Sequence, residues 1–275
     1  MDYIEFSLHL LPGHQPDILM AQLADLGFES FLEPEEGILG YVRQDLFDPD
    51  VFLPTLNEMV TKGILLYRYT TIPGQNWNAV WESNYDPVVI DNKCMVRAPF
   101  HEPVNGMPID IVISPKMSFG TAHHETTTLM ARALMEENPA GQRVLDMGCG
   151  TGILAILACK LGAHEVVAID NDEWAFANAI ENIEINNTSC ISVLRGEAAD
   201  IPLLPFNLVM ANINRNILLC DMAIYTKALV PSGTLLISGF YEEDLEPIQI
   251  EASRAGLRFV SIRAENKWVA AKFVK

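Results

Sequence analysis

The stretch LDMGCGTG, residues 145–152, constrains the fold of this chain more than any other feature. The apolar run RVLDMG leads into its first glycine and predicts a buried strand, and GILAILACKLG starts at its last glycine and predicts a helix. A glycine-rich turn between a strand and a helix lets a ligand approach bare backbone, and the helix N-terminus offers unpaired N–H donors. The pattern therefore predicts a ligand-binding strand, turn and helix.

Strand and helix patterns continue to the C-terminus. Further strands are predicted over EVVAID, CISVLRG, FNLVMAN and GTLLISGF, mostly with helical segments between them, and LRFVSIRAE and KWVAAKFVK form a closing pair. Repeated β-α units predict a parallel sheet covered by helices on both faces, with ligands at the carboxyl ends of the strands. The closing pair, separated by little more than a turn, adds one antiparallel strand. We expect a Rossmann-like α/β domain.

The first part of the chain has a different pattern. Residues 1–72 show the order β-α-β-β-α-β, which is typical of a small ferredoxin-like α+β domain and implies no function alone. Residues 73–87 begin with Pro-Gly and end with Asp-Pro, which predicts a linker. We therefore expect two domains, at 1–72 and 88–275.

Charge and composition limit the partners. The chain has 36 acidic and 18 basic residues, a formal net charge of −18, which disfavours direct nucleic-acid binding and favours a basic protein partner. No apolar run approaches the ~18 residues of a membrane span, and MDYIEFSLHL lacks the features of a signal peptide. The five cysteines are scattered, which predicts free thiols. We expect a cytoplasmic protein without membrane contact, and a monomer because no heptad pattern is evident.

Two acids indicate the ligand. The glycine spacing is G-x-G-x-G rather than the dinucleotide pattern G-x-G-x-x-G, and Asp146 puts a carboxylate where a pyrophosphate would need donors. Asp170 ends the next predicted strand, where it can accept hydrogen bonds from ribose hydroxyls. A ligand with a ribose and a positive charge fits both acids. S-adenosyl-L-methionine is the predicted cofactor, and Gly148, Gly150 and Gly152 are predicted to bind it with the two acids.

The segment MSFGTAHHETTTL, residues 117–129, precedes this unit. A metal site is not predicted because adjacent histidines on an extended chain point to opposite sides and no further ligand is evident. A phosphate site lacks a lysine and a glycine-rich stretch. We expect the segment to lie over the methionine part of the cofactor, with Phe119 as an apolar cover, Thr121 and Thr127 as hydroxyl contacts, and His124 fixing the loop.

Asn212 is the candidate catalytic residue. It ends the predicted strand FNLVMAN, where its side-chain oxygen can accept a hydrogen bond from an incoming amine, and it is also expected to contact the cofactor. Methyltransferases that act on planar amides or bases carry Asn/Asp-Pro-Pro-Tyr there, whereas this chain reads NINR. A flexible aliphatic amine is the better predicted target.

Four segments, FGTAHHETT, LDMGCGTGILAI, AIDNDEWAFANAIENIEIN and ANI, resemble the ribosomal-protein methyltransferase A (PrmA) family, which methylates large-subunit ribosomal protein eleven. The resemblance in amino-acid sequence covers roughly residues 75–275. In the N-terminal domain it lies in the predicted order of elements more than in the sequence. It implies a seven-stranded class I methyltransferase domain behind a ferredoxin-like domain that recognises the substrate. The family's cofactor contacts match Thr127, Gly148, Asp170 and Asn212. The implied substrate groups are lysine side-chain amines, with the N-terminal amine as a further candidate.

The chain departs from the family pattern at two places. Ala122, His123 and Glu125 replace a glycine, a threonine and the proline of F-G-T-G-T-H-P-T-T, and Asn214 and Arg215 stand where the family tends to N-I-L-A. These departures bear on substrate identity rather than on the cofactor. Three alternatives stay open: a methyltransferase acting on another protein or a small amine, a nicotinamide-dependent oxidoreductase, and a non-catalytic adapter that senses the cofactor.

Overall fold

The computed structural model describes residues 2–11, 16–32, 37–72, 86–115, 120 and 122–275. The chain divides into two compact units, Met1–Tyr85 and Asp86–Lys275. Most of the predicted linker, residues 73–85, lies outside the described residues. Within the described residues, no helix is long and apolar enough to cross a membrane.

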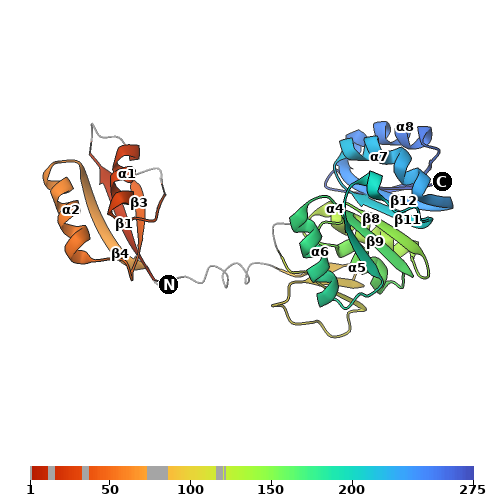
Figure 1. The fold of residues 1–275 in the computed structure, drawn as a ribbon, viewed down its shortest axis with the longest axis horizontal. Helices are drawn as coiled ribbons and strands as arrows, with labels where there is room; N and C mark the ends of the chain where they lie inside the picture. Colours follow the sequence, from red (N-terminus) through yellow and green to blue (C-terminus); the bar gives the residue numbers. More distant parts are fainter. Residues whose placement is uncertain (1, 12–15, 33–36, 73–85, 116–119, 121) are drawn as a thin grey trace. The chain divides into compact units, whose positions relative to one another are not determined.

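The first unit has the predicted order of elements. Strands β1 (Tyr3–Leu10), β2 (Ser30–Leu32), β3 (Ile38–Arg43) and β4 (Leu65–Ile72) form a sheet in the order β2-β3-β1-β4, and helices α1 (Pro16–Leu26) and α2 (Pro49–Thr61) complete the unit (Figure 1). The neighbouring strands are antiparallel. Phe6, at the centre of β1, is fully buried among aromatic rings that include Phe28, Phe47 and Tyr69. This unit has a core of its own.

The second unit is built on a seven-stranded sheet. Its strands are β8 (Arg143–Met147), β9 (Glu165–Asp170), β10 (Ile191–Arg195), β11 (Phe206–Asn212), β12 (Leu229–Tyr241), β13 (Arg258–Glu265) and β14 (Trp268–Val274), in the order β10-β9-β8-β11-β12-β14-β13. Strand β14 runs antiparallel to both of its neighbours, so the closing hairpin adds one antiparallel strand, as predicted.

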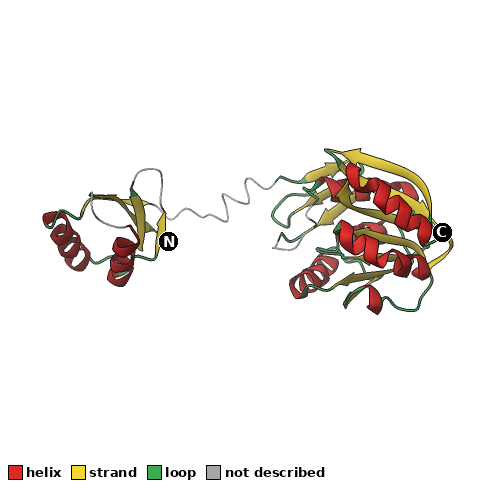
Figure 2. Ribbon diagram, turned by 90° about the horizontal axis from the view of Figure 1, so that it is seen from above, coloured by secondary structure: helices red, strands yellow, loops and turns green. Residues whose placement is uncertain are grey.

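Helices cover this sheet on both faces (Figure 2). Successive residues of β11 alternate between two cores, because side chains of a strand point to opposite faces. Leu208 and Met210 join the core under α4 (Glu125–Glu137) and α5 (Ile153–Lys160), whereas Val209 and Ala211 join the core under α7 (Arg215–Ala228) and α8 (Leu245–Arg254). Helix α6 (Glu173–Ile185) packs on β9 and β10.

Two features were not predicted. Strands β5 (Val88–Ile90), β6 (Cys94–Arg97) and β7 (Ile109–Val112) form a separate three-stranded sheet. Cys159 and Cys190 form a disulfide, which corrects the expectation that all five cysteines are free thiols. The end of α5 packs beside the start of β10, which brings together two cysteines that are 31 residues apart in the sequence. Cys94, Cys149 and Cys220 are free.

Candidate cofactor site

A cavity of about 1060 Å³ opens at the carboxyl ends of β8, β9 and β11. This volume lies at the upper end of the range for small-molecule sites, so a cofactor and a substrate side chain can both be accommodated. The cavity lies where the strand order turns from β8 toward β9 on one side and β11 on the other. Ligands of open α/β sheets bind at such a switch point.

The glycine turn after β8 forms the floor of the cavity. Gly148 has a positive φ of 69°, and a Cβ atom there would lie 2.2 Å from Ile213 Cγ2. A larger residue would therefore clash with the chain that follows β11. The Gly150 N–H donates a hydrogen bond of 2.8 Å to Asp170 Oδ2, and the Asp172 N–H donates one of 3.0 Å to Asp170 Oδ1. Each oxygen of Asp170 keeps a lone pair for a further donor.

Asp146 is the buried acid of the cavity. It is 1% exposed, and its Oδ2 accepts a hydrogen bond of 3.0 Å from the Ala155 N–H at the start of α5. The pKa of its carboxyl is raised from 3.8 to about 7, mainly because the group is buried. The hydrogen bond from Ala155 acts in the opposite direction and lowers this pKa, whereas the negative charge of Asp170 raises it further. A positively charged ligand would stabilise the ionised form of this carboxyl.

Binding of S-adenosyl-L-methionine is expected to become about tenfold tighter between pH 6 and pH 8, because only ionised Asp146 attracts a cation and its pKa is about 7. In the unliganded protein the raised pKa contributes stability that is full below about pH 4 and lost as pH rises through 7. Asp146→Asn should bind weakly at pH 8 with little pH dependence. Isothermal calorimetry across this range measures both proteins, and a flat wild-type profile would contradict this role of Asp146.

Two buried side-chain oxygens of the cavity have no hydrogen-bond partner among the described residues. They are Thr127 Oγ1, in the first turn of α4, and Asn212 Oδ1, at the end of β11. A buried polar atom without a partner costs free energy on the order of 1–3 kcal/mol. Both atoms belong to residues that line the cavity, so a bound ligand can supply the missing partners.

Most of the residues predicted to bind the cofactor line this one cavity: Thr127, Asp146, Gly148, Gly150, Asp170 and Asn212. Gly152 is absent from the lining and is the N-cap of α5, with a positive φ of 78°. Phe119 and Thr121 lie outside the described residues. His124 lines the cavity and caps α4, because its Nδ1 accepts a hydrogen bond of 3.3 Å from the Thr126 N–H. Within the described residues, no His, Cys, Asp and Glu cluster could hold a metal ion.

Several residues that line the cavity were not predicted from the sequence. Trp174, in the first turn of α6, is exposed at the rim, and its place shortly after Asp170 could have indicated it. Trp268 is the first residue of β14 and also lines the cavity. The centroid of its ring lies 4.8 Å from the centroid of the His124 ring. Gly239 has a positive φ of 96°, and a Cβ there would lie 2.1 Å from the Ile213 carbonyl oxygen. The only feature of the sequence that could have indicated Gly239 as a lining residue is a glycine inside a predicted strand, which often marks a close approach of another backbone.

The residues of the cavity fit a cationic nucleoside. Asp170 lies at the end of β9 with acceptor capacity for ribose hydroxyls, the buried carboxyl of Asp146 can attract a positive group, and Thr127 and Asn212 have side-chain oxygens without a partner among the described residues. A seven-stranded sheet with one antiparallel strand and this cavity defines the class I methyltransferases, whose cofactor is S-adenosyl-L-methionine. A family profile described as Ribosomal protein L11 methyltransferase (PrmA) matches residues 32–275. The chain belongs to this family.

Relatives named Ribosomal protein L11 methyltransferase match almost the whole chain. The protein of Bacteroides thetaiotaomicron is 43% identical, covering 99% of both chains, and that of Porphyromonas gingivalis is 45% identical, covering 99% of this chain and 98% of its own. The crystal structure of ribosomal protein L11 methylase from Lactobacillus delbrueckii subsp. bulgaricus has a TM-score of 0.62 at 25% identity, covering 69% of this chain and 97% of its own. The predicted fold class, methyltransferase activity and cofactor are thus confirmed, and the oxidoreductase alternative is set aside.

Proposed function

We propose that this methyltransferase transfers methyl groups to lysine side-chain amines of ribosomal protein L11, a basic protein of the large subunit. The observation that carries the proposal is the unpaired, buried Asn212 Oδ1 in the cavity wall. An amine nitrogen with N–H donors is a suitable partner for this oxygen. The formal charge of −18 supports a basic protein as the partner and disfavours RNA. We further propose that the chain acts as a cytoplasmic monomer.

The chemistry needs a neutral, aligned amine. S-adenosyl-L-methionine supplies a methyl group activated by its sulfonium, so the protein has to position the amine and exclude water. Holding a lysine with a free pKa of about 10.4 neutral near pH 7.4 costs about 4 kcal/mol, part of which desolvation in the cavity offsets. Asn212 Oδ1 would accept a hydrogen bond from the amine and direct its lone pair toward the methyl group. Asp146 and Asp170 would hold the cofactor.

The test is transfer of labelled methyl groups to ribosomal proteins from a strain that lacks this gene. We expect the label in ribosomal protein L11, at lysine residues located by mass spectrometry. Label in another protein, or in a small amine, would favour one of the alternative substrates. Cofactor binding without transfer to any ribosomal protein would instead favour an adapter.

We also propose that the ferredoxin-like unit recognises the protein substrate. Phe6→Ala should destabilise this unit by about 3–5 kcal/mol, because a fully buried aromatic side chain is removed from its core. We expect methylation of L11 to fall more than tenfold with cofactor affinity unchanged, since the described lining of the cavity belongs to the second unit. Val51→Ala, an apolar truncation at an exposed position of α2, is the control. Full L11 methylation by Phe6→Ala would contradict this role.

A further inference from the structure

Three asparagines, spaced one turn apart, face the end of β7 and the residues just after it: Asn178 and Asn182 lie in α6, and Asn186 is its C-cap. Asn186 pairs with both backbone groups of Val112: its Oδ1 accepts from the Val112 N–H at 2.9 Å and its Nδ2 donates to the Val112 carbonyl at 2.6 Å. Asn182 Oδ1 accepts from the Ser114 N–H at 2.8 Å, and Asn178 Nδ2 donates to the Ser114 carbonyl at 3.4 Å. The three side chains thus form hydrogen bonds with the backbone N–H and carbonyl groups of Val112 and Ser114, as a neighbouring strand would.

Asn182, unlike Asn186, also forms a hydrogen bond with the glycine turn. Its Nδ2 donates a hydrogen bond of 2.9 Å to the Thr151 carbonyl in the glycine turn, so one fully buried side chain joins Ser114 to that turn. The Thr151 hydroxyl in turn donates a hydrogen bond of 2.5 Å to the Gly120 carbonyl. Gly120 lines the cofactor cavity. A continuous chain of hydrogen bonds therefore runs from Ser114 through Asn182 and Thr151 to the cavity wall.

The backbone at Gly120 is built around this contact. A Cβ atom there would lie 2.7 Å from Thr151 Oγ1, and the φ of Gly120 is +107°, a conformation that side-chain-bearing residues rarely adopt. Thr151 and Asn182 are both 0% exposed, so water cannot replace either partner without opening the core. Glycine at this position leaves room for the Thr151 hydroxyl to come close to the backbone. This is an independent sign that the position of Gly120 relative to the glycine turn is fixed.

We infer that Asn182 is a positioning residue of the cofactor site. By holding the Thr151 carbonyl it fixes the conformation of the glycine turn, whose Gly148 and Gly150 line the cavity, and through Thr151 it fixes Gly120 on the cavity wall. A cavity wall that already has its bound conformation binds a ligand more tightly, because no ordering cost is left for the binding step. The inference rests on the cofactor assignment that underlies the proposed function, and it adds a determinant of affinity outside the cavity lining.

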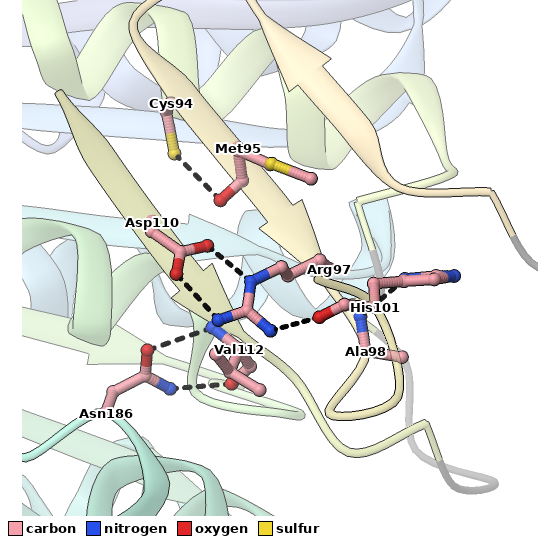
Figure 3. A network of polar contacts seen from close by, with 8 residues as sticks. All are labelled: Cys94, Met95, Arg97, Ala98, His101, Asp110, Val112 and Asn186. Atoms are coloured by element: carbon pink, nitrogen blue, oxygen red, sulfur yellow. Dashed lines mark hydrogen bonds and ion pairs between the residues drawn. The ribbon is translucent and has the colours of Figure 1, made fainter. Parts of the chain in front are cut away.

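Asn186, the C-cap of α6, provides a matched control one turn further along the chain. It makes two hydrogen bonds to the backbone of Val112 in the small sheet (Figure 3), and its Nδ2 also donates one of 2.8 Å to the Asn182 carbonyl in the same helix. None of its three hydrogen bonds goes to the glycine turn. In Figure 3 it lies close to the ion pair of Arg97 and Asp110, which joins β6 to β7. Loss of Asn186 therefore weakens the attachment of the small sheet without removing a hydrogen bond from the glycine turn.

The experiment compares Asn182→Ala and Asn186→Ala in the full-length protein. Calorimetric titration with S-adenosylhomocysteine gives the affinity, and thermal unfolding gives the stability. We expect both variants to lose stability to a similar degree, the Kd to rise about tenfold in Asn182→Ala, and the Kd of Asn186→Ala to stay within twofold of wild type. In turnover assays, Asn182→Ala should raise the KM for the methyl donor more than it lowers kcat.

Equal affinities of Asn182→Ala and wild type, or equal weakening in both variants, would overturn the inference. A wild-type protein that gives no heat with S-adenosylhomocysteine would instead reject the cofactor assignment. If Asn182→Ala does not fold, Thr151→Val and Thr151→Ser test the same chain of hydrogen bonds, because only the serine keeps the hydroxyl that binds Gly120. The valine variant should then bind about fivefold more weakly than the serine variant, and equal affinities would overturn the inference.

Discussion

Asn212→Ala is expected to lower kcat on the order of 100-fold while the affinity for S-adenosyl-L-methionine changes less than about fivefold. The Asn212 side-chain oxygen is buried without a hydrogen-bond partner in the part of the chain that the structure describes, and its residue lines the cavity. The incoming amine is the proposed partner, so the loss falls on the transfer step. Single-turnover kinetics with ribosomal protein L11, together with calorimetry of the cofactor, separates the two effects.

Asn214→Ala is the matched control for this variant. Asn214 also lines the cavity, two residues further along, but its Oδ1 already accepts a hydrogen bond of 2.8 Å from the Asn216 N–H and caps α7. Its loss should cost about 1 kcal/mol of stability and reduce kcat less than fivefold. Similar losses of kcat in both variants would show that the free oxygen of Asn212 has no special role.

The elements that carry the cofactor site could be predicted because each one has a local pattern. The strand before Gly148, the strand before Asp170 and the strand that ends at Asn212 are short apolar runs, and parallel strands bring their carboxyl ends to one edge. Three residues far apart in the chain could therefore be assigned to one site by their positions at strand ends alone. The glycine spacing then indicated which edge carries the site.

The rest of the site depends on long-range pairing that local patterns do not encode. Trp268 reaches the cavity because β14 inserts between β12 and β13, with Tyr241 opposite Trp268 in the register. The sequence predicts that β14 pairs with β13, but it does not state that β14 also pairs with β12 or in which register, since several registers satisfy the same apolar alternation. The disulfide between Cys159 and Cys190 escaped prediction for the same reason, because it depends on α5 packing beside β10.

Asp170→Ala is expected to weaken binding of S-adenosyl-L-methionine at least 30-fold while kcat at saturating cofactor falls only a few-fold. The variant removes the proposed acceptor for the ribose hydroxyls and also frees the N–H groups of Gly150 and Asp172, which Asp170 now binds. Hydrogen bonds to charged groups each contribute about 1.5–3 kcal/mol, so the loss of the ribose contacts alone supports an effect of this size. Calorimetry with the cofactor measures the change directly.

Asp200→Ala separates this effect from a general loss of an acidic side chain. Asp200 accepts a hydrogen bond of 2.9 Å from the Glu197 N–H but is not among the residues that line the cavity. Its variant should keep the wild-type Kd within twofold, with a modest loss of stability. Equal affinity of wild type and Asp170→Ala would remove the basis for the proposal that the ribose binds at the end of β9.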